Sequence, residues 1–334
     1  MALRLMEIVL PAGEALDMEA VLQDRTVLGR WKDLLPGDRS VWHLLLPAGE
    51  AEAIMDRVEQ RFPGRDDFRV VLLPVEGVLP RPPADPEPAA GTGPPGAERK
   101  NPGRVSREEL YTEVAEGLET SAGSLVMVVL SAVVAAVGLL RNDLAVIIGA
   151  MVIAPLLAPN VALSLATTLG DMALARRALR TGLLGFLVAL AFSAGIGLVF
   201  GVEPTLPAVA SRTQVGLADL VLALAAGAAG AMAVSGGLAG TLIGVMVAVA
   251  LMPPLVVFGM LLGAGELSAA FGAAMLVLAN LISVNLAGVA TFLAQGVGPR
   301  SWWEAERAAK ATRTAIGIWA VLFVVLAGLV IWTR

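Results

Sequence analysis

Long apolar stretches fill the last two thirds of this chain and constrain its fold more than any other feature. They approach or exceed the ~20 residues that a helix needs to cross a ~30 Å hydrocarbon core, and none has a charge well inside it. The apolar share of 57% also exceeds the usual share of about 45–50%. Residues 123–334 are therefore predicted to form an all-α membrane bundle with seven spans: Gly123–Leu140, Leu144–Leu169, Gly182–Phe200, Leu217–Val234, Leu238–Leu262, Leu267–Ala294 and Ala315–Trp332.

Residues 1–78 differ in character and predict a small α+β domain. Three β-rich apolar runs, LRLMEIVLP, SVWHLLLP and FRVVLLPV, accompany two helix candidates, GEALDMEAVLQD and AGEAEAIMDRVEQRF. With a further strand at TVLGRW, the order is strand, helix, strand, strand, helix, strand, as in ferredoxin-like domains. We expect a folded cytosolic cap. Binding of a small ligand or of a second copy is the alternative, by fold analogy alone. The single histidine, His43, lies in an apolar run and is expected to be structural.

Two shorter segments connect this domain to the spans. Residues 79–104 are rich in proline and glycine and predict an extended linker. Residues 105–122 predict an amphipathic helix that starts with the capping box SREE and carries an apolar stripe of Leu110, Val114 and Leu118. This helix is expected either to lie along the bilayer surface or to pack on the bundle.

Basic residues in the short loops predict the orientation of the spans. Most of them lie before the first span, between the second and third, and between the sixth and seventh, all on one side of the bilayer. Because loops rich in Lys and Arg stay in the cytoplasm, the N-terminus is predicted to be cytoplasmic and the C-terminus outside. The membrane is expected to be the cell inner (plasma) membrane.

An internal repeat relates the second and fifth spans. The stretch IGAMVIAPLLAP, from Ile148, aligns without a gap on IGVMVAVALMPP, from Ile243, at an offset of 95 residues. An offset of three spans reverses the direction through the bilayer. The sequence therefore predicts a 3+3 inverted repeat plus one further span, and such repeats with interrupted helices recur in transporters.

Prolines predict where these helices are interrupted. Pro155 and Pro159 lie near the middle of span two, and Pro253 and Pro254 lie just past the middle of span five. Each proline removes an amide donor and displaces the carbonyl four residues earlier, so both spans are expected to bend or unwind. Half-helices that begin after Pro159 and Pro254 would direct amides to one interior site suited to an anion or a dipolar solute. The alternative is that the prolines are ordinary kinks.

Buried polar residues gather near these positions. Asn160 and Ser164 follow the prolines of span two, and span six contains Asn280, Ser283 and Asn285. We interpret them as the lining of a solute pathway. The alternative is a set of interhelical hydrogen bonds, which contribute about 0.6 kcal/mol each in membranes. Since no carboxylate lies well inside a span, coupling through a central titratable group is not expected.

Glycines predict close contacts between helices. Gly236, Gly240 and Gly244 form a G-x-x-x-G-x-x-x-G row assigned to span five, and Gly259 and Gly263 form a second pair. Small residues at this spacing let helix backbones approach closely. Packing within the bundle is expected, and a subunit interface in a homo-oligomer is the alternative.

Several classes of function are not expected from this composition. The chain has no cysteine, which excludes disulfides and thiolate metal sites. No nucleophile with a base, metal cluster or phosphate loop is visible, so we expect neither an enzyme nor a cofactor or metal. The net charge of −5 argues against nucleic acid as a partner. The expected partners are the lipid bilayer and a small solute.

Three long stretches resemble a known family. They are LSAVVAAVGLLRNDLAVIIGAMVIAPLLAPNVALSLATTLGD, LAAGAAGAMAVSGGLAGTLIGVMVAVALMPPLVVFG and LVLANLISVNLAG. Together they resemble the bacterial and archaeal hydrophobic membrane proteins of domain-of-unknown-function family 389, over about residues 106–298. The N-terminal order resembles the subgroup with a ferredoxin-like cap, although the linker is long for the family. The family carries no established activity, so the resemblance implies a membrane protein and leaves the substrate open.

These features together predict a membrane transporter or channel for a small solute, with anions favoured, whose site lies where helices two and five are broken. The alternative is a non-transporting membrane scaffold or sensor whose cytosolic domain binds a ligand or partner.

Overall fold

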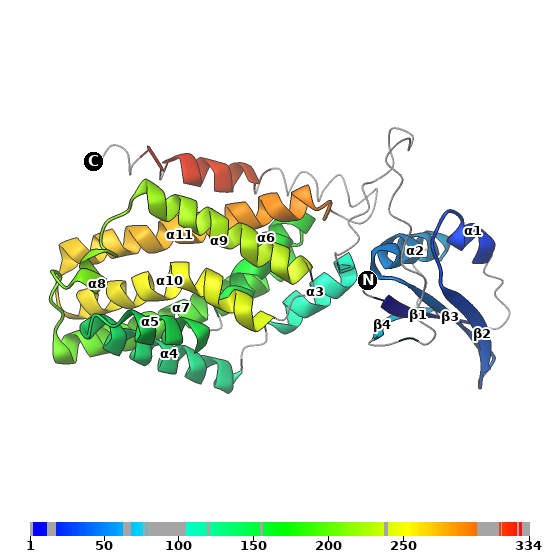
Figure 1. Ribbon diagram of the computed structural model, residues 1–334, viewed down its shortest axis with the longest axis horizontal. Helices are drawn as coiled ribbons and strands as arrows, with labels where there is room; N and C mark the ends of the chain where they lie inside the picture. Colours follow the sequence, from blue (N-terminus) through cyan, green and yellow to red (C-terminus); the bar gives the residue numbers. More distant parts are fainter. Residues whose placement is uncertain are drawn as a thin grey trace. The chain divides into compact units, whose positions relative to one another are not determined.

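Figure 1 shows the computed structural model of the protein, which describes residues 3–11, 18–62, 68–75, 78, 105–118, 121–153, 156–236, 240–298, 314, 316–325 and 327–328. For residues 19, 157 and 240–250 only the main chain is described. The chain divides into two compact units, Met1–Leu110 and Tyr111–Arg334. The predicted linker, 79–104, lies outside the described residues.

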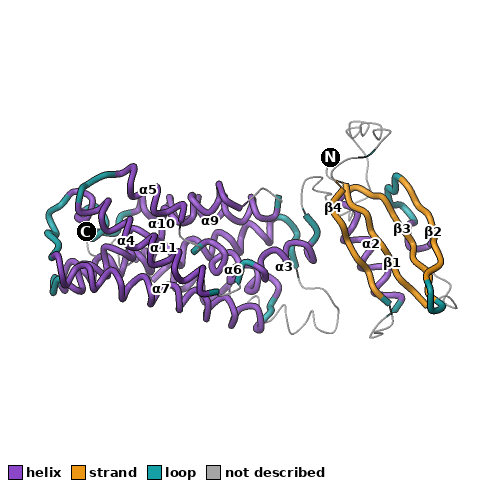
Figure 2. Tube along the Cα trace, turned by 90° about the horizontal axis from the view of Figure 1, so that it is seen from below, coloured by secondary structure: helices purple, strands orange, loops and turns teal. Residues whose placement is uncertain are grey.

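The first unit contains the predicted α+β domain. Its strands form one antiparallel sheet in the order β2-β3-β1-β4 (Figure 2). This topology confirms the predicted ferredoxin-like order of elements. The elements, in chain order, are β1 (Leu3–Pro11), α1 (Met18–Leu22), β2 (Gly29–Leu35), β3 (Arg39–Pro47), α2 (Ala48–Arg61) and β4 (Arg69–Val75).

The core of this domain lies between the sheet and its helices. Side chains alternate between the two faces of a strand, and Met6, Ile8 and Leu10 of β1 are buried on the face toward the helices. Ile54 and Val58, one turn apart on α2, pack in the same core. Each such side chain contributes roughly 1.5–3 kcal/mol when fully buried, so this face accounts for the stability of the sheet.

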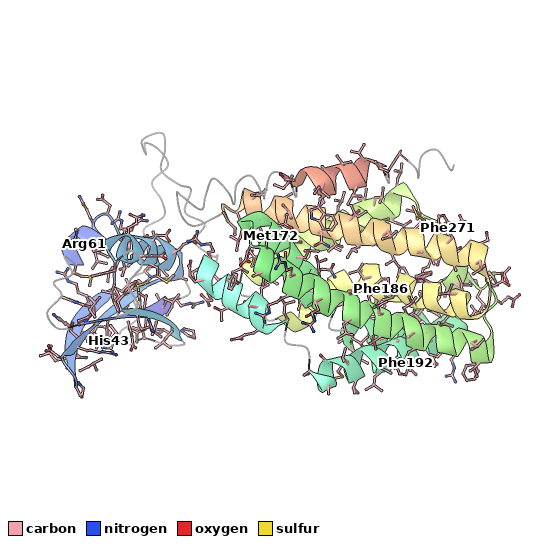
Figure 3. All side chains as sticks on the ribbon, turned by 180° about the vertical axis from the view of Figure 1, so that it is seen from behind. His43, Arg61, Met172, Phe186, Phe192 and Phe271 are labelled. Atoms are coloured by element: carbon pink, nitrogen blue, oxygen red, sulfur yellow. The ribbon has the colours of Figure 1, made fainter. Side chains whose placement is uncertain are left out.

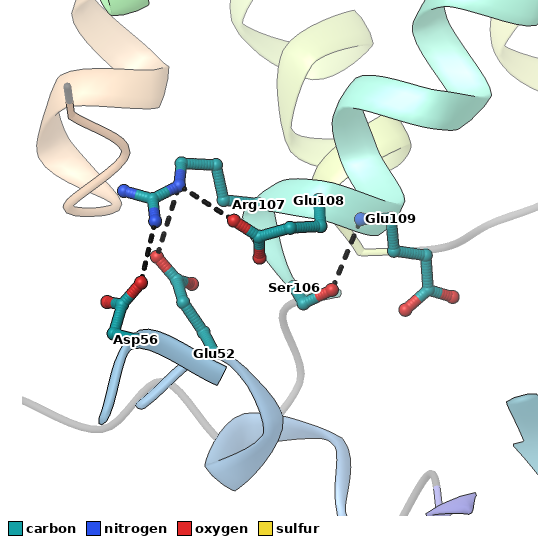
Figure 4. A network of polar contacts seen from close by, with 6 residues as sticks. All are labelled: Glu52, Asp56, Ser106, Arg107, Glu108 and Glu109. Atoms are coloured by element: carbon teal, nitrogen blue, oxygen red, sulfur yellow. Dashed lines mark hydrogen bonds and ion pairs between the residues drawn. The ribbon is translucent and has the colours of Figure 1, made fainter. Parts of the chain in front are cut away.

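An ion-pair network anchors the first turn of α3 (Arg107–Glu116) in the first unit (Figure 4). The Arg107 guanidinium contacts three carboxylates, those of Asp56 (3.0 Å), Glu108 (3.2 Å) and Glu52 (4.0 Å). Burial alone would lower the pKa of Arg107, but the carboxylates outweigh it and raise that pKa above its ordinary value. The Ser106 hydroxyl accepts a hydrogen bond from the Glu109 amide (3.2 Å), as the capping box predicts.

The remainder of the amphipathic helix is held by the second unit. α3 is shorter than the predicted segment 105–122, but its apolar stripe is buried, including Val114 and Leu118. The Tyr111 hydroxyl donates a hydrogen bond to the carboxylate of Asp171 (3.1 Å). Of the two predicted arrangements, the structure therefore has the one in which this segment packs on the bundle.

The second unit is a helix bundle (Figures 1 and 2). α10 is central, because it packs on α4, α5, α7, α9 and α11. Its buried residues share one apolar core with residues of α4, α5 and α7. The bundle consists of α4 (Ala122–Leu140), α5 (Leu144–Ile153), α6 (Leu157–Leu169), α7 (Met172–Phe200), α8 (Pro207–Ala210), α9 (Leu217–Ser235), α10 (Gly240–Gly263) and α11 (Leu267–Ala294).

The helices of this bundle have the length and surface of membrane spans. Within the described residues, α4, α7, α9 and α11 are long and apolar enough to cross a membrane, and α5 with α6 forms a fifth span if the bent pair is counted as one. Phe192 of α7 and Phe271 of α11 lie on the outside of the bundle, 49% and 67% exposed (Figure 3). Apolar side chains on the outside suit contact with lipid. A further apolar helix, Ile316–Val325, is shorter.

The continuity of α10 corrects the prediction of a break in span five. α10 is one helix from Gly240 to Gly263, although Pro253 and Pro254 lie inside it and are buried. A proline inside a helix costs about 3 kcal/mol because it removes a hydrogen bond and displaces a carbonyl. Helices that pack on α10 from several sides favour the helical path enough to outweigh this local cost.

Several helix bounds repeat at an offset of 95 residues. α4 and α9 begin at Ala122 and Leu217 and end at Leu140 and Ser235. α7 and α11 likewise begin 95 residues apart. The offset found in a short sequence match therefore recurs in the structure of two helix pairs. It also relates turn glycines with positive φ, Gly170 (70°) with Gly265 (81°) and Gly201 (66°) with Gly296 (77°).

Candidate functional site

The predicted interruption of span two is present in the structure. α5 ends at Ile153 and α6 begins at Leu157, with a bend of 56° between them. Pro155 falls between the two helices, outside the described residues. Pro159 lies in the first turn of α6, where a missing N–H costs no intrahelical hydrogen bond. No side chain of the described residues caps the start of α6, so the amides of its first turn need other partners.

Asn160, Ser164 and Asn285 form a hydrogen-bonded cluster between α6 and α11, just after the interruption. The Asn285 side-chain amide donates to Asn160 Oδ1 (3.1 Å) and to the Leu281 carbonyl (2.9 Å). Ser164 Oγ lies 3.2 Å from Asn285 Oδ1 and 3.0 Å from the Asn160 carbonyl. All three residues are buried, with Asn285 0%, Ser164 2% and Asn160 9% exposed. The structure thus brings together three of the residues predicted to line a pathway.

Most of the hydrogen-bonding capacity of this cluster is used internally. A side-chain amide has two N–H donors and one carbonyl acceptor, and Asn285 uses both donors and lies with its acceptor beside Ser164. Asn160 accepts from Asn285 and donates one N–H to the Leu156 carbonyl (2.8 Å). Its second N–H has no partner among the residues that the structure describes. One side-chain donor is therefore left beside the uncapped start of α6.

The other predicted pathway residues take no part in the hydrogen bonds within this cluster. Asn280 and Ser283 are buried on α11, and Ser283 donates to the Ala279 carbonyl one turn earlier (2.7 Å). The hydrogen bonds that hold the cluster involve neither residue. Pro253 and Pro254 lie on α10, which packs on α5 and, more lightly, on α6. The two segments of the repeat are therefore neighbours, but only one of them is interrupted.

The glycines divide between two roles. Gly236 is the C-cap of α9, whereas Gly240 and Gly244 lie in α10, so the predicted row does not lie on one helix. α9 extends one residue beyond the predicted span, and this extension places Gly236 at its end. The second pair is confirmed in packing: a Cβ at Gly263 would overlap the Ala194 carbonyl oxygen of α7. In return, a Cβ at Gly197 of α7 would overlap the Met260 carbonyl oxygen of α10.

The 95-residue offset also relates two helix crossings. It maps Ser164 of α6 onto Gly259 of α10, and Ser193 of α7 onto Gly288 of α11. In both crossings a serine faces a glycine. A Cβ at Gly288 would lie 2.6 Å from Ser164 Oγ, and a Cβ at Gly259 would lie 2.5 Å from Ser193 Cβ. Sequence reasoning missed Ser193 and Gly288, although the same offset, extended beyond the twelve-residue match, finds them.

The fold and this site define a multi-span membrane protein with one interrupted span and an N-terminal α+β domain. The chain belongs to the family described as Domain of unknown function (DUF389), whose model matches residues 151–286. It is similar to an uncharacterized protein of Methanocaldococcus jannaschii, with 35% identity over 298 residues, which are 89% of each chain. No solved structure matches the chain. The matched range includes the interruption, α10 and the asparagines of α11.

Proposed function

We propose that the protein is a transporter or channel that moves a small solute, with anions favoured, across the membrane. The observation that carries this proposal is the interruption of span two beside the buried Asn160–Asn285 pair. A helix can be interrupted at membrane depth only where the released backbone groups meet protein or water. The uncapped start of α6 also carries the positive end of the helix dipole, which favours an anion or a carboxylate. The proposal gives the chain no catalytic role.

The proposal includes seven spans arranged as a 3+3 inverted repeat plus one. The shared offset of 95 residues between the bounds of α4 and α9 and between turn glycines supports the repeat. The exchange of serine and glycine between two crossings supports it further, because unrelated helix pairs would share no contact at that offset. In this topology the N-terminal domain is cytoplasmic and the C-terminus outside, in the inner (plasma) membrane, as the basic loops favour.

The inverted repeat assigns the two crossings to opposite halves of the pathway. The α6–α11 crossing offers amide and hydroxyl groups to a solute. The positions that correspond to Asn160 and Asn285 are Leu255 and Leu190, so the α7–α10 crossing offers none at those points. We therefore assign recognition to the α6–α11 side and closure of the pathway to the α7–α10 side.

Flux into liposomes tests the proposal. The purified full-length protein would be reconstituted, and solute entry after an osmotic step would be followed by light scattering. The solutes are the potassium salts of chloride, nitrate, formate and phosphate, each with a potassium ionophore, and glycine. We expect at least one of these solutes to enter faster than into protein-free liposomes, and Asn285→Leu to lose that flux. Thr291→Val is the matched control, because it removes a hydroxyl from α11 that, among the residues that the structure describes, bonds only to the Ala287 carbonyl. A folded protein without flux for any of them contradicts the proposal.

A non-transporting scaffold or sensor is the second candidate. The internal satisfaction of the Asn160–Ser164–Asn285 cluster favours it, since a static clamp between helices needs no solute. For a scaffold, Asn285→Leu would lower stability and change no flux. The same liposome measurement, paired with thermal unfolding of both variants, therefore separates the two candidates.

A further inference from the structure

The face of the N-terminal sheet opposite α1 and α2 is apolar and open. Trp31, Leu35, Val71 and Leu73 on this face are 39–45% exposed, and no described element of the domain covers it (Figure 2). An antiparallel sheet with one solvated face normally carries polar residues on that face. An apolar face of this kind indicates contact with a partner.

The charged and titratable side chains of this face are few and ordered. They are Glu7, Asp33, Arg39, His43 and Arg69. His43 (labelled in Figure 3) lies between two of them, with its ring nitrogens 3.3 Å from a carboxylate oxygen of Glu7 and of Asp33. Its ring stacks on Trp31 at a centroid distance of 5.2 Å. The single histidine therefore lies on this face with only 15% of its side chain exposed, under the ring of Trp31.

We propose that this face pairs with the same face of a second copy of the chain, about a two-fold axis parallel to the strands and between β1 and β3. This rotation places β1 of one copy over β3 of the other, and β2 over β4. Each cross-strand row then lies over the same row of the other copy. The register defines two central rows: Asp33, Val41, Val9 and Arg69, and Trp31, His43, Glu7 and Val71.

We choose a second copy of the chain as the partner that covers this face because charges on the face are complementary to one another. In the first row, Asp33 of one copy meets Arg69 of the other, on either side of Val9 and of Val41, which is already buried within its own domain (4% exposed). In the second row, His43 meets Glu7 of the other copy, and Trp31 meets Val71. In these two rows acidic groups face basic or hydrogen-bonding groups and apolar groups face apolar ones, as in a specific isologous contact. Arg39, one row further along, faces Pro11 of the other copy. Packed sheets turn by about 30°, which leaves the β1–β3 pairs nearest the axis in place and shifts the Asp33–Arg69 pair of the outer strands the most, within reach of these two long or mobile side chains.

The size of the face sets where this contact is expected. Four strands about 4.8 Å apart and four rows about 6.8 Å apart give roughly 500 Å², below the about 800 Å² per partner of a stable interface. The domains would therefore not pair tightly alone. Copies held in one membrane meet at a higher effective concentration, so the contact is expected in the full-length, membrane-inserted protein, whatever that protein transports.

Cross-linking in membranes tests the contact directly, because the chain has no cysteine. Leu45→Cys lies beside the proposed axis, and Leu5→Cys is a second variant at the paired position on β1. Gln60→Cys, exposed on α2 away from this face, is the control. With a short bifunctional maleimide, the two sheet variants are expected to form dimers and the control is not. Equal cross-linking of the control, or none for either sheet variant, overturns the proposal.

A charge exchange then tests the geometry. In the Leu45→Cys background, Asp33→Arg would place an arginine of one copy opposite Arg69 of the other. This repulsion is expected to weaken pairing about tenfold, equivalent to ~1.4 kcal/mol. Arg69→Asp would do the same with two carboxylates, and the double variant would restore cross-linking. If the double variant is no better than either single one, the axis is wrong. If Leu45→Cys is protected from a monofunctional maleimide while no dimer forms, another occupant covers the face and the proposal fails.

Discussion

Two crossings in the membrane unit occupy positions related by the same offset, yet they are held by different means. At the α6–α11 crossing, Asn160, Ser164 and Asn285 join the helices by hydrogen bonds. At the α7–α10 crossing the backbones touch, and Gly197 and Gly263 leave no room for a Cβ. The hydroxyl of Ser193 in the second crossing is buried and has no hydrogen-bond partner among the described residues.

The difference separates two ways of holding helices in lipid. Lipid tails supply no hydrophobic drive between helices, so association depends on close van der Waals contact or on interhelical hydrogen bonds. Close backbone contact offers a solute no side-chain amide, and the contact is lost when the helices move apart. Hydrogen-bonding side chains can exchange one partner for another at small cost, since each pair contributes only about 0.6 kcal/mol on average. Under the proposed function, the α7–α10 crossing therefore suits closure of the pathway and the α6–α11 crossing suits recognition of the solute.

The largest effect is expected from adding one methyl group at the α7–α10 crossing. Gly197→Ala would place a Cβ on the Met260 carbonyl oxygen and force the helices apart, at a cost of about 3 kcal/mol. Gly195→Ala, two residues earlier on α7, is the matched control, because a Cβ there has no atom within 4 Å. Thermal unfolding of both variants in detergent measures the difference. Equal stability would mean that the backbones are not in contact at this crossing.

A smaller loss is expected when the polar crossing loses its central amide. Asn285→Leu leaves Asn160 Oδ1 buried without its donor, and an unsatisfied buried group costs about 1–3 kcal/mol. The double variant Asn160→Leu with Asn285→Leu gives this crossing the residues that the offset places at the other one, Leu255 and Leu190. We expect the double variant to lose less than the sum of the two single variants, by about 1 kcal/mol. Additive losses would show that the two amides do not interact.

The serines of the two crossings should respond in opposite directions to the same change. Ser164→Ala removes a hydroxyl that bonds within the cluster and should cost about 1 kcal/mol. Ser193→Ala removes a buried hydroxyl without a partner in the described part of the chain, and the protein should be as stable or up to about 1 kcal/mol more stable. The comparison uses the same unfolding measurement. A loss at Ser193 as large as that at Ser164 would mean that Ser193 has an acceptor.

How much of the fold and of the candidate site could be predicted from the sequence depends on whether each feature is set by neighbouring residues or by tertiary contacts. The order of the α+β elements and most span bounds follow from local periodicity, and the break in span two follows from local proline chemistry. The contact between Asn160 and Asn285 joins residues 125 positions apart. It depends on where α6 crosses α11, which no local pattern encodes. α10 stays helical through two prolines because neighbours surround it, and this tertiary effect is likewise absent from the local rule.

The smallest expected effect concerns the equivalent turns before α7 and α11. Asp171 caps α7 by accepting from two backbone amides and also accepts from Tyr111, whereas Glu266, 95 residues later, makes no side-chain cap. Burial, the hydrogen bond to Asp171 and the charge of Asp171 raise the pKa of Tyr111. Because the chain has a single tyrosine, the ultraviolet absorbance of its phenolate reports this pKa directly. Asp171→Asn should move the pKa of Tyr111 back toward its ordinary value of about 10.

The sign of the pH dependence follows from that shift. A group whose pKa is raised in the folded state stabilises the fold below its unfolded pKa, about 10 for tyrosine, and this stabilisation is lost as the pH rises through the raised value. Tyr111→Phe should therefore cost about 0.5 kcal/mol from pH 7 to 9, a small amount because the site is partly exposed. The difference from the unmodified protein should vanish at higher pH. A cost that stays constant through the titration of Tyr111 would mean that the hydrogen bond to Asp171 does not hold α3 on α7.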